Sequence, residues 1–513
     1  MNPLIQALRQ PLPGGRFYPL LPPLFMALVA IGLWHHPLWF DELQNWRIIL
    51  DSPTLPALFS NLKYEGHPSL WYLLLWALQW ISVKPAMIKL AHWAVVSAAI
   101  AVVGYLAPLA RRDRVLIMAS YFMLYQWALI SRNYAIGMLM AFLYAWLECA
   151  HPRRRLCIYL TLGLLANCSA FGLLLSVALV GTRALRAWRA TSLTTALRQE
   201  AAGLALYVAL VAGFIWTVLP PADMAYAGVG GERPTFHTVD GALAVFRRLI
   251  FDRTYKFGDE YYLGKGITTA WGRWVDAVLA VAAAALFSLA PFAVLWRDRA
   301  MLSVYALTFL IVFLFCFIVY QQPEYRHVGV LWLGFVTCFW LYRHRGGAPT
   351  LLATLYCGVW ALWGAYSYAG EFRHPFANSE AMAHWVGDHG LADAYWTSYP
   401  DEAGVPLSAV LGIPTYSPTC QCTLTHVVWN RRRNRLLPSQ SVGGMLLPTL
   451  RQHPVAYLVA ENNAEKDPDG LKRGLDEAGI HYELLQRFTG ATFGNYDLFR
   501  LTAPTDGVDP EQR

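Results

Sequence analysis

Long apolar segments recur through the first 370 residues, and they constrain the fold of this chain more than any other feature. A helix needs about 20 apolar residues to span the hydrocarbon layer of a membrane, and several segments approach that length. Hydrophobic residues make up 56% of the 513 residues and charged residues only 14%, too few to cover the surface of a soluble domain. We therefore predict a polytopic, mainly α-helical membrane protein. The segments run near residues 18–34, 68–83, 86–110, 115–130, 134–150, 156–182, 201–219, 271–296, 301–320, 328–342 and 350–368.

Short arginine clusters between these segments predict how the helices are oriented. Positively charged loops tend to face the cytoplasm, so the net charge of +8 indicates topology, and we expect no nucleic-acid partner. If every cluster is cytoplasmic, residues 156–182 must form two short helices with a turn at Asn167-Cys168-Ser169. Residues 68–110 hold two apolar segments, but the predicted orientation allows only one net crossing of the membrane there. Either residues 68–83 are re-entrant, or one arginine cluster does not face the cytoplasm. The expected total is about eleven to thirteen helices. The clusters are Arg111, Arg112 and Arg114; Arg153 to Arg155; Arg183, Arg186 and Arg189; Arg297 and Arg299; and Arg343 and Arg345.

With this orientation, most of the unusual polar residues of the helical region fall on the opposite, outer face. Ionisable residues at membrane depth are costly and tend to be functional, so we predict that they share one site. The alternative is that they are ordinary loop residues, since any polar residue between helices must lie on one side or the other. The set comprises Asp41, Glu42, Glu65, His67, Arg132, Asn133, Tyr134, Asn167, Glu324, Tyr325, Arg326 and His327.

The set has an anionic half and a cationic half. The carboxylates of Asp41 and Glu42 could accept a proton from a hydroxyl group or hold a hard divalent cation. Arg132, Arg326 and His327 could hold a phosphate, because guanidinium groups bind phosphate oxygens bidentately and keep their charge when partly desolvated. A carboxylate base facing a phosphate clamp indicates transfer of a phosphate-bound group.

Three motifs have the order and spacing of a known family. Phe40-Asp41-Glu42 follows the first apolar segment, Gly66-His67-Pro68-Ser69 begins the second, and Ser131-Arg132-Asn133-Tyr134 precedes a later one. From about residue 18 to residue 368 the chain resembles the GT-C membrane glycosyltransferases. It is most similar to enzymes that use polyprenyl-phosphate sugars, such as protein mannosyltransferases and aminoarabinose transferases. The resemblance implies a GT-C-type helix bundle embedded in the lipid bilayer.

The resemblance also implies an activity. A sugar would pass from a polyprenyl-phosphate-linked donor to an acceptor hydroxyl at the outer, periplasmic face of a bacterial inner membrane, with inversion at the anomeric carbon. The acceptor would be a glycan, a lipid or a protein. The family's catalytic carboxylate corresponds to Asp41, and its basic residues near the donor phosphate correspond to Arg132 and, less directly, to Arg326 and His327. Substrate binding is therefore assigned to Glu65, His67, Arg132, Tyr134, Asn167, Glu324, Tyr325, Arg326 and His327, and catalysis to Asp41 and Glu42.

One departure from the family bears on metal binding. Family members often carry a second acidic residue soon after the Arg-Tyr turn, whereas here the next carboxylate after Tyr134 is Glu148, near the predicted cytoplasmic end. Dependence on a divalent cation such as Mg²⁺ or Mn²⁺ is therefore left open. The competing function is a transporter or flippase of lipid-linked saccharide intermediates, although we find no internal repeat. An enzyme needs Asp41 within reach of Arg132 or Arg326, whereas a flippase needs a polar path across both leaflets.

After Tyr368 the composition changes and predicts a second domain, with the boundary between residues 370 and 371. Residues 379–388 and 471–478 are helix-like, and residues 394–398, 455–460, 482–488 and 496–501 are strand-like, which indicates a small extracytoplasmic α/β domain. Its role is acceptor recognition or structural support. Cys420 and Cys422 are separated by one residue, so a disulfide between them is geometrically unfavourable, and zinc binding with His426 is equally weakly supported.

Overall fold

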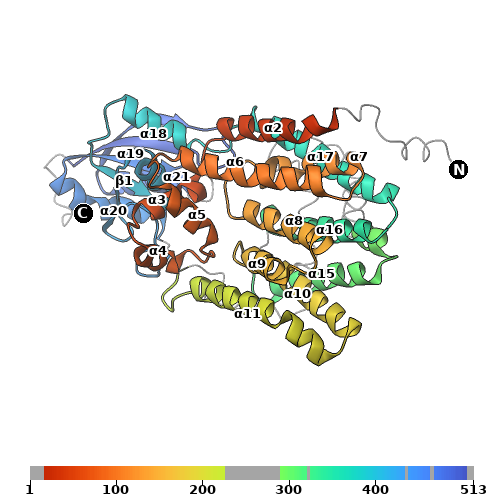
Figure 1. The fold of residues 1–513 in the computed structure, drawn as a ribbon. Helices are drawn as coiled ribbons and strands as arrows, with labels where there is room; N and C mark the ends of the chain where they lie inside the picture. The colour runs from red at the N-terminus through yellow and green to blue at the C-terminus, as the bar shows by residue number, and fades with distance from the viewer. Residues whose placement is uncertain (1–16, 226–288, 321–323, 434–436, 463–466, 505–513) are drawn as a thin grey trace, which may run out of the picture.

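The structure is a computed structural model that describes residues 17–225, 289–320, 324–433, 437–462 and 467–504. A helical bundle occupies one end of the molecule and a mixed α/β domain the other, as Figure 1 shows. The bundle helices are α2 (Leu21–His35), α6 (Ala86–Ala101), α8 (Tyr134–Ala150), α9 (Arg155–Ala166), α10 (Ala170–Ala190), α11 (Leu193–Val218), α15 (Arg299–Ile318), α16 (Tyr325–His344) and α17 (Leu351–Glu371).

Five segments of the described chain are long and apolar enough to cross a membrane. The protein is thus a multi-pass integral membrane protein, and the predicted mainly α-helical fold with a C-terminal α/β domain is confirmed. The GT-C type of the bundle and the total of eleven to thirteen membrane helices stay predictions. Most of the predicted segment at residues 271–296 lies outside the described residues. The five segments are Tyr18–His35, Ala86–Leu106, Ala170–Ala190, Leu193–Val218 and Arg299–Ile318.

The predicted break near Asn167 is present. Helix α9 ends at Ala166 and α10 begins at Ala170, and the Ser169 hydroxyl caps α10 by accepting a hydrogen bond from the Gly172 amide at 2.9 Å. The Asn167 side chain secures the turn, because its amide donates to the carbonyl oxygens of Gly163 and Leu210, each at 2.9 Å. The apolar stretch at residues 156–182 is therefore two helices, as the arginine pattern requires.

The conflict over residues 68–110 is also resolved. Within residues 68–83 the structure has only the short helix α5 (Leu70–Leu78), and nine residues rise about 13 Å, less than half of the hydrocarbon layer. Helix α5 instead packs with α3 (Phe40–Leu50) and α4 (Leu55–Asn61) in a separate hydrophobic core. Among the described residues of this part, only α6, continued by a π-helix, η3 (Val102–Leu106), is long and apolar enough to cross.

The next predicted segment, residues 115–130, is not one helix. It divides into α7 (Arg111–Met118) and a π-helical turn, η4 (Tyr121–Gln126), with Ser120 capping the second piece. The side chains of η4 are buried against α17 and α16, where Phe122 lies 5.2 Å from the ring of Trp332 and 4.9 Å from that of Trp360. In place of one regular helix, this segment therefore forms two short pieces, and the second is packed among large aromatic rings.

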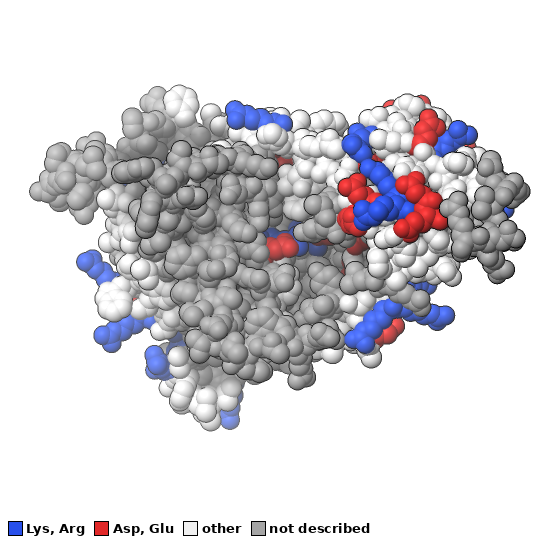
Figure 2. Space-filling model, turned by 180° about the vertical axis from the view of Figure 1, so that it is seen from behind, with Lys and Arg blue, Asp and Glu red and all other residues white. Residues whose placement is uncertain are grey.

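A buried ionic cluster joins four helices at the end of the bundle away from the C-terminal domain. Arg183 on α10, only 7% exposed, contacts Glu148 of α8 at 2.5 Å and Glu200 of α11 at 3.0 Å. Arg186 also reaches Glu148, at 2.9 Å, and Arg155 reaches Glu200, at 3.0 Å. Figure 2 shows that basic side chains predominate at this end, on the left of that view. Their placement on the cytoplasmic side stays a prediction.

Replacing Arg183 with methionine should lower the thermal midpoint of the protein by several degrees. The change removes the arginine that Glu148 and Glu200 share. Each carboxylate keeps one other arginine partner, so the cost should be smaller than the about 3–5 kcal/mol of leaving a buried charge with no partner. Arg189→Met is the matched control, because Arg189 is exposed in the last turn of the same helix. Thermal unfolding in detergent measures both variants. Equal midpoints for the two would show that the cluster does not stabilise the bundle.

The C-terminal domain is a six-stranded sheet with the order β3-β2-β1-β4-β6-β5. Strands β1, β2 and β4 are parallel to one another, and the remaining pairings are antiparallel. Helices α20 and α21 share one hydrophobic core with the sheet, and α18 and α19 share a second. The strands are β1 (Trp396–Tyr399), β2 (Thr415–Ser417), β3 (Cys422–Leu424), β4 (Val455–Glu461), β5 (His481–Phe488) and β6 (Tyr496–Thr502), and the helices are α18 (Ser379–Asp388), α19 (Val405–Leu411), α20 (Val442–Gln452) and α21 (Pro468–Glu477).

All of the elements predicted for this domain are found, but the expectation against a disulfide is wrong. Cys420 and Cys422 are disulfide-bonded, with their Cα atoms 5.2 Å apart. They lie at the tight turn between the antiparallel strands β2 and β3, where Gln421 has a φ of 53°. This turn brings the two Cα atoms to an ordinary disulfide separation, which an extended tripeptide would not do.

Candidate active site

The first turn of α3 carries the candidate site. Trp39 is extended and precedes the helix, and its amide donates to Glu42 Oε2 at 3.1 Å. This contact satisfies a free donor at the helix N-terminus, so α3 begins at Phe40. The helix start therefore holds Asp41 and Glu42 in a rigid turn at the end of the bundle that adjoins the C-terminal domain (Figure 1).

Asp41 is paired with two arginines that are distant in sequence. Its Oδ2 atom lies 2.5 Å from Arg132 Nη1 and 3.7 Å from Arg326 Nη1. The Arg132 side chain is 6% exposed, whereas the side chains of Asp41 and Arg326 are each 22% exposed. The structure thus unites an acid from the first loop with arginines from two later segments, and leaves the carboxylate within reach of solvent.

The electrostatic surroundings keep Asp41 ionised. Burial by itself disfavours the charged form, but the guanidinium of Arg132, and then that of Arg326, outweighs it and holds the pKa of Asp41 below its usual value. Asp41 is therefore a carboxylate at neutral pH and is able to accept a proton. Glu324 offsets part of the positive charge, since its Oε2 atom lies 2.9 Å from Arg326 Nη2.

His67 orients Arg132. Arg132 Nη2 lies 2.9 Å from His67 Nε2, and His67 Nδ1 lies 2.6 Å from the carbonyl oxygen of Glu65. A guanidinium can only donate, so Nε2 accepts and Nδ1 carries the hydrogen that it donates to the carbonyl. Burial, with the charge of Arg132, lowers the pKa of His67 to about 4. His67 is thus a neutral ring that fixes the arginine.

Glu65 connects this region to its surroundings. Gln44 Nε2 donates to Glu65 Oε1 at 3.0 Å, and the Tyr72 hydroxyl lies 3.4 Å from Oε2. Burial raises the pKa of Glu65 to about 7, which places its titration near neutral pH.

Replacing Glu65 with glutamine should flatten the pH dependence of stability between about pH 4.5 and pH 7. The carboxyl group holds its proton more tightly in the folded protein than in the unfolded chain. Its contribution to stability is therefore complete below the unfolded pKa and is lost as the pH rises through the folded one. Glutamine still accepts from Gln44 and never ionises. The thermal midpoint of the variant, relative to that of the unsubstituted protein, should change little near pH 4.5, should rise as the pH approaches about 7, the folded pKa of Glu65, and should level off above it. A difference that is constant over this range would contradict a titrating Glu65.

Glu42 differs from Asp41 in its surroundings. Its side chain is fully buried, and both of its oxygens have partners. The Ser131 amide donates to Oε1 at 2.5 Å, the Trp39 amide donates to Oε2, and His36 Nε2 lies 3.4 Å from Oε2. Of the two carboxylates assigned to catalysis from the sequence, only Asp41 has access to solvent.

The remaining predicted residues surround the site or lie apart from it. Tyr134 stacks on Trp127 and contacts His327, with ring centroids 6.0 Å apart in each case. His327 Nδ1 accepts a hydrogen bond from the Glu324 amide at 2.9 Å, and its ring stacks on Phe171 at 4.9 Å. These contacts give His327 a packing and capping role at the start of α16. Asn167 serves the turn between α9 and α10, and the side chain of Tyr325 lies outside the described residues.

The C-terminal domain also reaches the site, which sequence analysis missed. The ring of Trp39 packs against Phe376 at 5.6 Å and Phe493 at 5.1 Å, and the Arg326 guanidinium lies 6.0 Å from the Trp39 ring centroid. On the other side, Phe40 contacts Trp429 edge-on at 6.3 Å. The two aromatic residues before Asp41 therefore bind the C-terminal domain, while Asp41 contacts arginines of the bundle.

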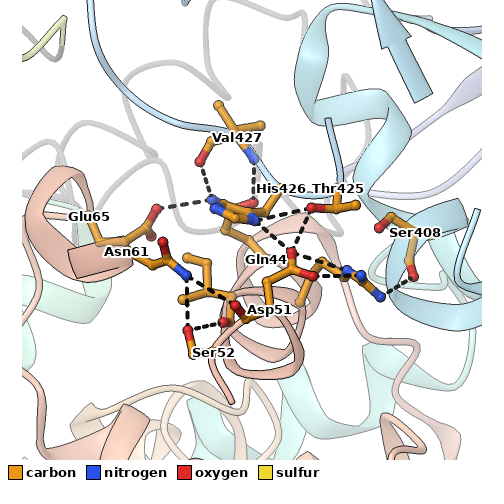
Figure 3. A network of polar contacts seen from close by, with 11 residues as sticks. Gln44, Asp51, Ser52, Asn61, Glu65, Ser408, Thr425, His426 and Val427 are labelled. Carbon is orange, nitrogen blue, oxygen red and sulfur yellow. Dashed lines mark hydrogen bonds and ion pairs between the residues drawn. The ribbon is translucent and has the colours of Figure 1, made fainter. Parts of the chain in front are cut away.

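A polar network fastens the same helix to the C-terminal domain further along (Figure 3). Gln44 exchanges two hydrogen bonds with the backbone of Val427, at 2.8 and 3.0 Å. Asp51 Oδ2 lies 2.8 Å from His426 Nδ1 and accepts from the Thr425 hydroxyl at 2.6 Å. Helix α3 is thus held near its start and at its end by a strand-to-helix connection that lies 374 to 383 residues later in the chain, for which the sequence contains no local signal.

The described segments contain no group of three or more His, Cys, Asp or Glu residues that could hold a metal ion. Among the described residues there is thus no ligand set for the suggested zinc site at Cys420, and none for Mg²⁺ or Mn²⁺. The negative charge of Asp41 is balanced by the guanidinium groups of Arg132 and Arg326.

Comparisons with known proteins give no match: no family model fits the sequence, and no curated protein or solved structure matches it. Inference about function therefore rests on the geometry around Asp41.

Proposed function

We propose that this protein is a membrane glycosyltransferase that moves a sugar from a polyprenyl-phosphate donor to an acceptor hydroxyl. The observation that carries the proposal is the contact of Asp41 with Arg132 and Arg326 at one end of a membrane-spanning bundle. A solvent-accessible carboxylate beside two guanidinium groups supplies both a proton acceptor and a site for phosphate.

In the proposed reaction, the Asp41 carboxylate accepts the proton of the acceptor hydroxyl. The hydroxyl oxygen attacks the anomeric carbon, and the bond between that carbon and the phosphate oxygen breaks. The leaving lipid phosphate takes the electron pair, and Arg132 and Arg326 stabilise the charge that develops on it. A single displacement of this kind inverts the configuration at the anomeric carbon. His67 contributes by holding Arg132 in place.

The position of the site favours a donor held in the membrane. Asp41 follows α2, which belongs to the first membrane-spanning segment, by six residues, so the site lies near one surface of the bilayer. Polyprenyl phosphate presents its headgroup at that depth. We place this surface, with the C-terminal domain, on the periplasmic side of a bacterial inner membrane, because the arginine clusters gather at the opposite end of the bundle.

The alternative, a flippase for lipid-linked saccharides, has less support. A flippase needs a polar path between the leaflets, but in the described part of the bundle centre large apolar rings pack together. Phe142 lies 6.4 Å from Trp340 and 6.5 Å from Trp332, and all three are fully or almost fully buried. This packing favours chemistry at one face over passage through the bundle.

Reconstitution of the purified protein in liposomes tests the function. The protein is supplied with a panel of polyprenyl-phosphate sugars and with glycan, lipid and peptide acceptors, with and without Mg²⁺ or Mn²⁺, and products are identified by mass spectrometry. A new glycosidic bond of inverted configuration is the expected result. Movement of a labelled lipid-linked sugar between leaflets without a new bond would support the flippase instead.

A further inference from the structure

A second charged cluster is sealed from solvent and includes the residue that follows Asp41. It comprises His36, which follows α2, Glu42 in the first turn of α3, and Glu371 at the end of α17, and each is fully buried. His36 Nδ1 lies 2.8 Å from Glu371 Oε1, and His36 Nε2 lies 3.4 Å from Glu42 Oε2. One imidazole thus bridges two carboxylates from distant parts of the chain.

The two carboxylates favour the charged form of His36. Burial disfavours the imidazolium, but Glu371 and then Glu42 outweigh burial and raise the pKa of His36 to about 10. Burial also opposes the charge on Glu42, and the charge of His36 holds the pKa of Glu42 below its usual value. Buried ion pairs contribute little net stability because both ions lose water, so stability is a weak explanation for this cluster.

Glu42 makes two further contacts that reach both sides of the Asp41–Arg132 pair. Its Oε1 atom accepts from the amide of Ser131, the residue before Arg132, and its Oε2 atom accepts from the amide of Trp39. Glu42 itself follows Asp41 in the chain. One buried side chain therefore binds the backbone of the residue before the arginine and the backbone two residues before the aspartate.

We infer that Glu42, anchored by His36 and Glu371, is a positioning residue that holds Asp41 opposite Arg132. Its relevance to catalysis rests on the proposed function, although its effect on the pair does not. Without the Glu42 carboxylate, the segment that carries Arg132 loses the hydrogen bond between its backbone and α3, while the side-chain contact of Arg132 with Asp41 remains. A misplacement of about 1 Å between reacting groups is enough to lower a rate about a hundredfold.

The inference can be tested without a substrate, by following how readily Asp41 is protonated. A water-soluble carbodiimide with glycinamide labels protonated carboxyl groups, and peptide mass spectrometry reports the labelling of Asp41 at pH 5 and pH 6. In the folded Glu42→Gln variant, Arg132 should lie farther from Asp41, and the pKa of Asp41 should rise by about one unit. Labelling should then increase about tenfold over the unsubstituted protein.

Two further variants make the test specific. Glu380→Gln is the matched control, because Glu380 also accepts an amide hydrogen bond near this turn, from Leu38 at 3.1 Å, but does not contact Ser131. It should leave Asp41 labelling unchanged. Glu42→Asp keeps the charge beside His36 but is too short to reach both amides, so it should raise the labelling as well. This shorter variant decides the question if Glu42→Gln does not fold.

Unchanged Asp41 labelling in folded Glu42→Gln or Glu42→Asp protein would overturn the positioning role. An equal increase in Glu380→Gln would also overturn it, because any disturbance near the turn would then have the same effect. Increased labelling in a protein that forms no glycosidic bond in liposomes would leave the positioning role intact and refute the proposed function. Glycosyl transfer by the protein, together with unchanged Asp41 labelling in the Glu42 variants, would support the proposed function and refute the positioning role.

Discussion

Replacing Asp41 with asparagine should reduce glycosyl transfer by about 10²–10⁴-fold, the usual contribution of a positioned general base. Asparagine has nearly the same shape and can still accept a hydrogen bond from Arg132, but it cannot take the proton of the acceptor hydroxyl. The lowered pKa of Asp41 shows that the surroundings favour the charged carboxylate, so no other group is needed to ionise it. Rates in liposomes at saturating donor and acceptor measure the effect.

The variant must remain folded for this result to be informative. Its thermal midpoint and its elution from a sizing column should match those of the unsubstituted protein. Asp469→Asn serves as the control for loss of a carboxylate, because the Asp469 side chain is 79% exposed on the C-terminal domain, where it forms an ion pair with Lys472. Full transfer by Asp41→Asn would end the assignment of Asp41 as the base.

Replacing Arg132 with glutamine should lower transfer by about 10²–10³-fold, as removal of one preorganised donor to a developing oxyanion does in other enzymes. Arg132 is nearly buried and is fixed by Asp41 and His67, so in the proposed reaction it would meet the leaving phosphate without reorganisation. We expect a higher KM for the lipid-phosphate donor together with a lower kcat. Steady-state kinetics with varied donor concentration separate the two effects.

The same variant should change the pH profile in a defined direction. In the proposed reaction Asp41 acts as a carboxylate, so the rate should fall as the pH drops through the pKa of Asp41. Loss of Arg132 removes the main charge that lowers this pKa, and the fall should therefore begin at a higher pH. Arg326→Gln should show a smaller shift, because Arg326 lies 3.7 Å from Asp41 and not 2.5 Å. An unchanged donor KM and an unchanged acid limb in Arg132→Gln would refute its placement at the phosphate.

Features of the site that depend on residues close together in the sequence were largely predictable. The acidic pair after the first apolar segment, the His67 motif and the Arg132 turn are short local signals, and the structure brings all three together. The division of work between Asp41 and Glu42 was not predictable. Both are carboxylic acids next to each other in the sequence, and the surroundings of each side chain in the fold determine which one is sealed in the protein.

The contribution of the C-terminal domain also had no local signal. Trp39 meets Phe493, and Gln44 meets Val427, across separations of several hundred residues. Aromatic residues near a membrane segment are expected at the lipid interface, so Trp39 had an adequate explanation without a partner. Contacts of this kind follow from how two domains dock, which depends on the shapes of both surfaces.

The amino-acid sequence by itself determined the membrane character of the chain, the break between α9 and α10, and the change to an α/β domain. Hydropathy, charge placement and period-two alternation act over a few turns of chain, and each is readable without knowledge of the fold. Tertiary structure alone decided that α5 is too short to cross, that Cys420 and Cys422 form a disulfide, and that Asp41 faces two arginines while Glu42 faces His36. These outcomes depend on distances between segments that are remote in the chain, and such distances are set only when the helices and the terminal domain pack together.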